Sequence, residues 1–144
     1  MANVLVVDDD SSVSEAIAEI LASEGHAVQI AADGLEGLRR MFEALPDLIV
    51  LDIEMPVLSG PEMAKQILIA DAGHELIPIV LISGVADLRQ VAVLVGTPYA
   101  LPKPCGLDAL LDVTAEALRV RTPPQPSRAF VDSSQPKDKA TYDE

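Results

Sequence analysis

The sequence predicts a doubly wound α/β fold, in which five parallel strands alternate with five helices that cover both faces of the sheet. Three observations support this fold class. Short continuous runs of Val, Ile and Leu recur along the chain, the segments between them place apolar residues at spacings of three and four, and Gly or Pro commonly separates the two kinds of segment. Strands that are buried on both faces read as such continuous runs, which is typical of a parallel sheet.

The five expected strands differ in apolar character. Continuous apolar runs predict three strands inside the sheet: Val4–Val7, Leu48–Leu51 and Ile79–Ile82. Ala27–Ala31 alternates around Gln29, which predicts a strand at an edge. Tyr99–Leu101 lies between Pro98 and Pro102, and neither proline can donate a hydrogen bond to a sheet. We therefore expect the fifth strand to be short and to lie at an edge.

The first two helices are expected to begin at capping residues. Ser12 and Glu15 have the spacing of a capping box, and Gly25 marks the end of the first helix. Asp33 and Glu36 predict the start of the second helix. Apolar residues follow both starts at helical spacing, so that one face of each helix can pack on the sheet.

The other three helices are predicted mainly from their apolar stripes, which lie within residues 63–68, 88–95 and 107–118. Pro61 suits the first turn of the third helix, and Gly96 marks the end of the fourth. The fourth helix is apolar nearly all round over Val91–Val95. An exposed apolar face there would suit a protein partner or self-association.

We expect one folded domain over residues 1–121 and a flexible tail over residues 122–144. The tail is rich in Pro, Ser and charged residues and has no apolar period. No second folded domain is expected in the chain. The single cysteine, Cys105, excludes an internal disulfide framework and fits a reducing cytoplasm. The amino terminus does not resemble a signal peptide, and no apolar run reaches the roughly 18–20 residues that span a bilayer.

The charge of the chain limits its partners. The formal net charge is −13, and Lys and Arg form no cluster. Binding to a phosphate backbone depends on clustered positive charge, so we expect no direct contact with nucleic acid. Trp is absent and aromatic residues make up only 3% of the chain, which leaves little for stacking bases. Metal ions and basic protein surfaces are the expected partners.

Acidic and basic side chains follow the ends of the predicted strands. Asp8 and Asp9 follow the first strand, Asp52 the third, Ser83 the fourth and Lys103 the fifth. In a doubly wound sheet, ligands bind at the carboxyl ends of the strands, near the switch in strand order. We therefore expect these side chains to converge on one edge of the sheet.

This set of side chains favours phosphoryl chemistry at a metal ion. Carboxylates that are brought together repel, and a divalent cation relieves the repulsion; an all-oxygen site suits Mg²⁺. A metal beside Lys103 and Ser83 can hold a phosphoryl group, and Asp52 can itself be the nucleophile that forms an acyl phosphate. Asp10 is assigned to the loop or helix start and not to the metal.

These residues resemble the receiver domain of bacterial response regulators. The resemblance covers residues 3–121 and rests on four motifs in order: VVDD at the first strand end, D-x-x-M-P-x-x-x-G from Asp52 to Gly60, Ser83-Gly84, and Lys103-Pro104. It implies a flavodoxin-like, CheY-like sheet with strand order 2-1-3-4-5. It also implies that Pro104 follows a cis peptide bond.

The resemblance implies a role for each site residue. Asp52 would accept a phosphoryl group from a sensor histidine kinase or a histidine phosphotransfer protein. Ser83 and Lys103 would bind phosphoryl oxygens. The implied magnesium ligands are Asp8, Asp9, Asp52 and the backbone carbonyl of Glu54. The expected protein is thus a single-domain response regulator that signals to a downstream protein, and it is not an enzyme beyond its own phosphorylation and dephosphorylation.

The sequence departs from this family on the expected output surface. Receivers commonly carry an aromatic residue three positions before the lysine, and here that position is Ala100. Tyr99 should point to the opposite face of the strand. Either a bulge lets Tyr99 substitute, or the protein signals without that aromatic, which is the alternative we favour. A homodimer through the fourth helix, fifth strand and fifth helix is a further expectation.

Two other functions fit parts of the sequence. A small Mg²⁺-dependent phosphohydrolase also places an aspartate after an apolar strand, and its usual second acid two residues on would be Glu54. Against this reading, the chain has no cap and little length for a substrate pocket. A receiver-like interaction module that never uses its phosphate site is the other alternative, and the altered position at Ala100 keeps it open.

Overall fold

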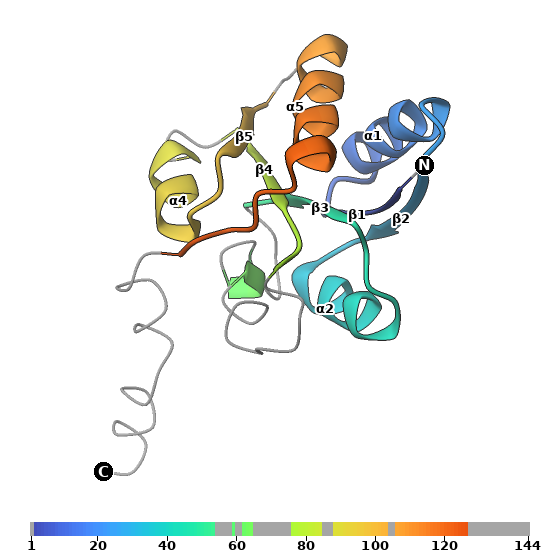
Figure 1. The fold of residues 1–144 in the computed structure, drawn as a ribbon. Helices are drawn as coiled ribbons and strands as arrows, with labels where there is room; N and C mark the ends of the chain where they lie inside the picture. The colour runs from blue at the N-terminus through green and yellow to red at the C-terminus, as the bar shows by residue number, and fades with distance from the viewer. Residues whose placement is uncertain are drawn as a thin grey trace, which may run out of the picture.

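The computed structural model describes residues 2–53, 59, 62–64, 76–84, 88–103 and 106–126. Within these residues strands and helices alternate, except that β4 follows β3 in the order of described elements (Figure 1). They are β1 (Asn3–Val7), α1 (Ser11–Ser23), β2 (Ala27–Ala31), α2 (Gly34–Glu43), β3 (Leu48–Asp52), β4 (Ile79–Ser83), α4 (Leu88–Val95), β5 (Tyr99–Pro102) and α5 (Leu107–Val120). Of the predicted third helix, residues 62–64 are described and helical, and the remainder lies outside the described residues.

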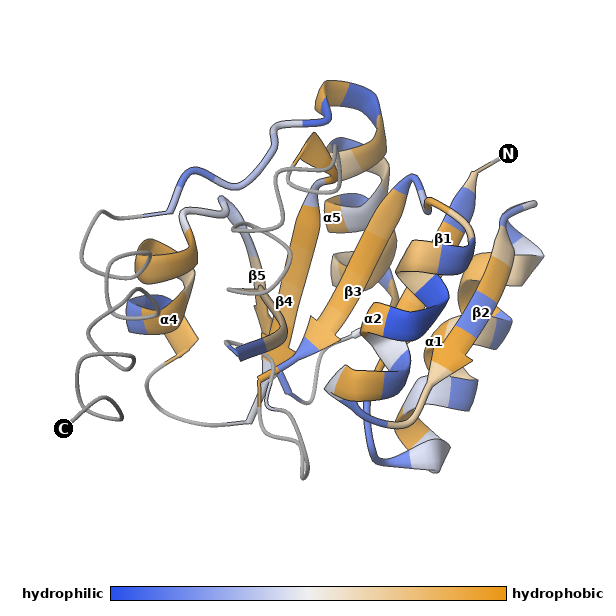
Figure 2. Cartoon of the chain, turned by 90° about the horizontal axis from the view of Figure 1, so that it is seen from below, coloured by the Kyte–Doolittle hydropathy of each residue, from blue (hydrophilic) through white to orange (hydrophobic). Residues whose placement is uncertain are grey.

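The five strands form one parallel sheet in the order β2-β1-β3-β4-β5. The predicted fold class and strand order are therefore confirmed. Every residue of β3 and β4 is buried, whereas β2 alternates between exposed and more buried positions at one edge. Figure 2 shows the same contrast in hydropathy, with β3 and β4 hydrophobic along most of their length. None of the described helices is long and apolar enough to cross a membrane.

The core lies in two layers, one on each face of the sheet. Alternate residues of the central strands point to opposite faces, so that Ile49 and Leu51 belong to one layer and Leu48 and Val50 to the other. The first layer includes residues from α2 and α4, and the second includes residues from α1 and α5. Each fully buried Leu or Ile stabilises the fold by roughly 1.5–3 kcal/mol, so the sheet is held rigidly from both sides.

The start of α1 differs from the predicted capping box. Asp10 is the N-cap, and its Oδ1 accepts hydrogen bonds from the N–H groups of Ser12 (3.0 Å) and Val13 (3.3 Å). Ser12 lies inside the helix, so the assignment of the cap to Ser12 and Glu15 is wrong. The reason is that the Asp10 carboxylate already accepts from the N–H groups of the first turn. The assignment of Asp10 to the helix start is confirmed.

β5 pairs with β4 without a bulge. The register runs from Val80 opposite Tyr99 through Leu81 opposite Ala100 to Ser83 opposite Pro102. Tyr99 is buried in the layer beneath α1 and α5, whereas Ala100 packs against the opposite layer. The bulge that would let Tyr99 take the place of Ala100 is therefore wrong, and the predicted opposite orientation of the two side chains is confirmed.

The chain after α5 continues along the edge of the domain. Arg121 ends the helix in a left-handed conformation (φ 56°). The Thr122 N–H donates to the Tyr99 hydroxyl (3.4 Å), and the Gln125 N–H donates to the Gly96 carbonyl (2.9 Å). Residues 122–126, the first part of the predicted tail, thus bond to β5 and to the turn after α4. Residues 127–144 lie outside the described residues, and the domain boundary stays a prediction.

We expect Asp10→Ala to lower the free energy of unfolding by about 1 kcal/mol, because two N–H groups of the first turn of α1 lose their acceptor. Asp10→Asn keeps an acceptor and should stay within about 0.5 kcal/mol of the wild type, as should Ser12→Ala. Urea unfolding followed by circular dichroism measures all three. A larger loss in Ser12→Ala than in Asp10→Ala would restore the predicted capping box.

Candidate functional site

The carboxyl ends of four strands bring the predicted site residues to one edge of the sheet. Asp8 directly follows β1, Asp52 ends β3, Ser83 ends β4 and Lys103 directly follows β5. Backbone hydrogen bonds extend the sheet past these ends, since the Asp8 N–H donates to the Ala31 carbonyl (3.1 Å) and the Lys103 N–H donates to the Ser83 carbonyl (2.9 Å). The site residues therefore stand on backbone that the sheet itself holds in place.

Three of the predicted site residues form a carboxylate cluster. Asp8, Asp9 and Asp52 each offer one oxygen, and these oxygens lie within 4.8 Å of one another. Asp8 and Asp52 are buried, at 1% and 4% exposure, whereas Asp9 is exposed. The sheet thus holds two members of the cluster in place. The cluster is open to solvent on the Asp9 side, where a small ion or a phosphoryl donor can approach.

Lys103 supplies positive charge to this cluster. Its Nζ lies 2.9 Å from Oδ2 of Asp8 and 3.5 Å from Oδ1 of Asp52. The resemblance implied that Lys103 binds a phosphoryl oxygen, and it did not predict that Asp8 is the nearest partner of the ammonium. Chain spacing gives no signal of this pair, because 95 residues separate the two side chains. Only the shared edge of the sheet brings them together.

Burial and neighbouring charge set the ionisation of the site. Burial raises the pKa of Asp52 to about 6, and the negative charges of Asp8 and Asp9 add to this effect, while Lys103 opposes it. Burial alone would lower the pKa of Lys103, but its hydrogen bonds and ion pairs with Asp8 and Asp52 outweigh this, so that its pKa is raised. Lys103 stays charged at neutral pH, and ionisation of Asp52 lowers the stability of the folded chain.

The donor set fits a magnesium ion. The candidate ligands are carboxylate oxygens, which Mg²⁺ prefers, and one lysine does not balance three acids. A divalent cation held by Asp8, Asp9 and Asp52 would offset the repulsion that adds to the effect of burial on the pKa of Asp52. Glu54, whose carbonyl the resemblance adds to the ligands, lies outside the described residues, as do Pro104 and Cys105.

Ser83 and Asp10 border the cluster in different ways. Ser83 is buried at 1% exposure, next to Ile82, which lies opposite Asp52 in the register of β3 and β4. The Asp10 N–H donates to Oδ1 of Asp8 (2.9 Å), while the Asp10 side chain caps α1. Asp10 therefore orients Asp8 through its backbone and keeps its own carboxylate out of the cluster.

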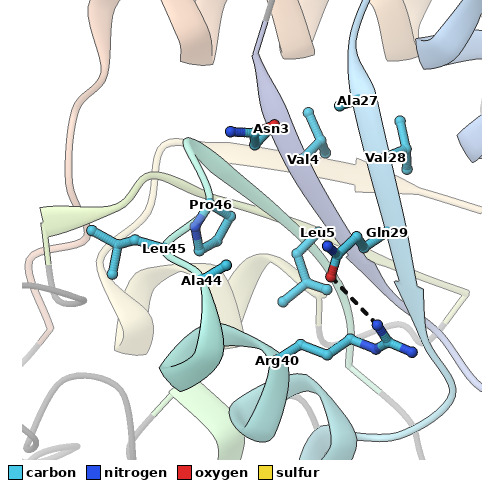
Figure 3. A pocket seen from close by; sticks show the side chains of 10 residues that line it. All are labelled: Asn3, Val4, Leu5, Ala27, Val28, Gln29, Arg40, Ala44, Leu45 and Pro46. Carbon is cyan, nitrogen blue, oxygen red and sulfur yellow. Dashed lines mark hydrogen bonds between the residues drawn. The ribbon is translucent and has the colours of Figure 1, made fainter.

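A hollow lies between α2 and the strands β1 and β2, away from the carboxylate cluster (Figure 3). It measures about 350 Å³, and residues near the starts of the two strands line part of it, including Asn3 and Ala27. Its one charged lining residue is Arg40, which donates to Oε1 of Gln29 (3.4 Å). The lining includes no acid and no nucleophile, so the chemistry of the described residues concentrates at the carboxylate cluster.

Comparison with known proteins gives a family match over most of the chain. The model of the response regulator receiver domain matches residues 4–115. The response regulator MprA of Mycobacterium sp. (strain KMS) is 36% identical over 134 residues, which are 90% of this chain and 57% of MprA. MprA of Mycobacterium avium (strain 104) is 38% identical over 123 residues, which are 85% of this chain and 53% of MprA. The chain spans about half the length of these curated relatives.

Solved structures share the fold. The chemotaxis response regulator CheY4 of Vibrio cholerae superposes with a TM-score of 0.75 at 32% identity, over 82% of this chain and 99% of CheY4. NtrX from Brucella abortus superposes with a TM-score of 0.75 at 30% identity, over 83% of this chain and 27% of NtrX. This fold therefore occurs both in a chain of similar extent and as part of a longer chain.

Without divalent cations, we expect Asp52→Asn to stabilise the folded chain at neutral pH. Folding raises the pKa of Asp52 from 3.8 to about 6, so the wild type loses stability as the pH rises between these values. The variant does not titrate there and should gain roughly 1–3 kcal/mol above about pH 6.5. At about pH 4 the folded-state carboxyl is protonated and the unfolded-state carboxyl only partly ionised, so most of this advantage should vanish.

Urea unfolding in EDTA at about pH 7.5 and about pH 4 measures the difference. A wild type that is the more stable protein at pH 7.5, or a difference that does not change with pH, would show that burial and the neighbouring acids do not destabilise the ionised Asp52.

Proposed function

This chain belongs to the response regulator receiver family, and we propose that it accepts a phosphoryl group on Asp52 in a Mg²⁺-dependent reaction. The observation that carries the proposal is the convergence of Asp8, Asp9 and Asp52 with Lys103 at one edge of the sheet. Buried acids are costly unless they are paired or bind a metal, so a site of this kind points to a function that needs it.

The reaction needs a nucleophile, positive charge and a fixed geometry. A carboxylate oxygen of Asp52 forms the new bond to phosphorus as the bond from phosphorus to the donor's leaving nitrogen or oxygen breaks, and the electron pair leaves with the donor. A bound Mg²⁺ would neutralise charge on the phosphoryl oxygens. Lys103 turns from the acids toward one of these oxygens, and the Ser83 hydroxyl binds another.

The position of Asp52 at the end of a fully buried strand favours this role. β3 is covered on both faces, so the carboxylate cannot retreat from its neighbours. Its raised pKa reflects a nucleophile that is poorly solvated. Asp52 is still mostly ionised above pH 7, and a poorly solvated carboxylate gives up little hydration when it attacks phosphorus.

The donor is proposed to be a sensor histidine kinase or a histidine phosphotransfer protein. A protein donor must contact the surface next to the site, and an apolar groove of about 530 Å³ between α1 and α5 reaches Lys103. Ala16, Ile20 and Leu107 contribute to its lining. An apolar helix face of the donor would fit this groove and bring its phosphohistidine close to Asp52.

Phosphorylation is proposed to act as a switch of the surface that includes α4, β5 and α5. Moving Lys103 and Ser83 onto a phosphoryl group changes the ends of β4 and β5, and a tenfold shift between two surface states needs only about 1.4 kcal/mol. A downstream protein reads the change. The chain spans about half the length of its curated relatives. We propose that the receiver domain signals to its target by itself.

A receiver-like interaction module is the second candidate. The observation that favours it is Ala100, whose small side chain on β5 cannot reorient as an aromatic would. Such a module would keep the fold and the surface without using Asp52. Phosphorylation of Asp52 is the property that separates the two candidates.

Incubation with acetyl phosphate tests the proposal directly. We expect intact-mass spectrometry to show a gain of one phosphoryl group in the wild type with Mg²⁺, and no gain in EDTA or in Asp52→Asn. Asp10→Asn is the matched control, since it removes a neighbouring acid that caps α1 and should be phosphorylated like the wild type.

A gain that persists in Asp52→Asn would move the acceptor elsewhere. The absence of any gain with acetyl phosphate, and with a panel of histidine kinases, from a folded protein would favour the interaction module.

A further inference from the structure

An apolar groove of about 590 Å³ lies between α4 and β5. Leu88, Ala92 and Val93 line it from the helix, and Pro98 and Ala100 line it from the strand side. Val93 is 68% exposed, and Ala100 offers only a methyl group near the middle of the strand. The groove therefore has room for one large apolar side chain, and the charged residue in its lining is Arg89.

The segment after α5 arrives at one end of this groove. Gln125 bonds through its N–H to the Gly96 carbonyl, and Pro124 is buried. Gly96 adjoins Thr97 and Pro98, which line the groove. Figure 1 shows the segment crossing from α5 to the C-terminal end of α4. Gly96 has a φ of 79°, and a Cβ atom there would collide with the backbone of Gln125. The sequence of this turn thus leaves space for the segment.

The residues that follow suit the groove in length and chemistry. The described chain ends at Pro126, and Ser-Arg-Ala-Phe-Val-Asp comes next, with Phe130 and Asp132. Four residues beyond Pro126 reach up to about 13–14 Å. The eight residues of α4 span about 12 Å, so Phe130 can reach any point of the groove from the Gly96 end.

Charge favours one direction along α4. Arg89 lies in the first turn of the helix, far from Gly96, and its side chain is exposed. A segment that enters at Gly96 and runs toward the start of α4 brings Asp132 to Arg89 just after Phe130 has passed the apolar lining. This direction pairs opposite charges in a chain whose net charge is −13.

We propose that Phe130 docks in the groove between α4 and β5 of its own chain, with Asp132 next to Arg89. The segment then covers part of the α4 and β5 surface. A partner protein or a second copy of the chain that binds there has to displace it. This inference rests on the groove and on the path of residues 122–126, and it holds whether or not Asp52 is phosphorylated.

The absence of Trp from the chain allows a clean test. Phe130→Trp places the only Trp of the 144-residue chain at the proposed contact, and Tyr142→Trp places it near residue 144 as a control. We expect the Trp at position 130 to emit at shorter wavelength and to be quenched by acrylamide at least threefold less efficiently than the Trp at position 142. The difference should be independent of protein concentration.

A second substitution locates the contact. Val93→Glu in the Phe130→Trp protein puts a charge into the groove at an exposed position, so the fold should survive, as circular dichroism can verify. We expect emission and quenching to become those of the Tyr142→Trp control. A Trp at position 130 that is as accessible as the control would overturn the proposal, as would protection that survives Val93→Glu. Protection that grows with protein concentration would place Phe130 in a second copy and overturn docking within the chain.

Discussion

The site depends on the repulsion among three carboxylates that the sheet forces together. Asp8 directly follows β1, Asp52 ends the adjacent strand β3, and both are buried, so they cannot separate without disrupting the sheet. Lys103 offsets part of the repulsion through its contacts with both acids, and the pKa of Asp52 is still raised, first by its burial and then by the charges of Asp8 and Asp9. A divalent cation, and then a phosphoryl group that draws Lys103 away from the acids, fits this imbalance of charge. The fold thus maintains a strained electrostatic arrangement that ligands can relieve.

β5 connects this site with the α4 and β5 surface. Lys103 directly follows the strand, Ala100 faces the groove beside α4, and the Tyr99 hydroxyl accepts from Thr122 in the segment after α5. The strand has only four residues and lies at the edge of the sheet, so only β4 fixes it through ladder hydrogen bonds. A change in the partner of Lys103 therefore acts on the element of the sheet that also borders the groove and the C-terminal segment.

The sequence predicted most of the fold and the convergence of the site residues on one edge of the sheet, because both depend on strong local patterns. Continuous apolar runs mark β1, β3 and β4, and parallel strands bring the residues at their carboxyl ends together. The sequence wrongly indicated Ser12 as the cap of α1, since Asp10 and Ser12 have similar capping chemistry. It also missed the ion pair of Lys103 with Asp8, and the hydrogen bond from the Gln125 N–H to the Gly96 carbonyl. The latter is a bond between backbone groups, which leaves no mark in the choice of side chains beyond a glycine.

A Mg²⁺ titration of thermal unfolding at about pH 7.5, with NaCl matched for ionic strength, tests whether Asp8, Asp9 and Asp52 bind a divalent cation. If the three carboxylates form a metal site, Mg²⁺ raises the unfolding temperature of the wild type saturably, with a stabilisation of about 2.7 kcal/mol at one hundred times the Kd. The shift should shrink in Asp9→Asn, which removes the exposed carboxylate of the cluster, and persist in Asp10→Asn. An equal shift with NaCl, or an unchanged Mg²⁺ response in Asp9→Asn, would show that the three carboxylates do not form a magnesium site.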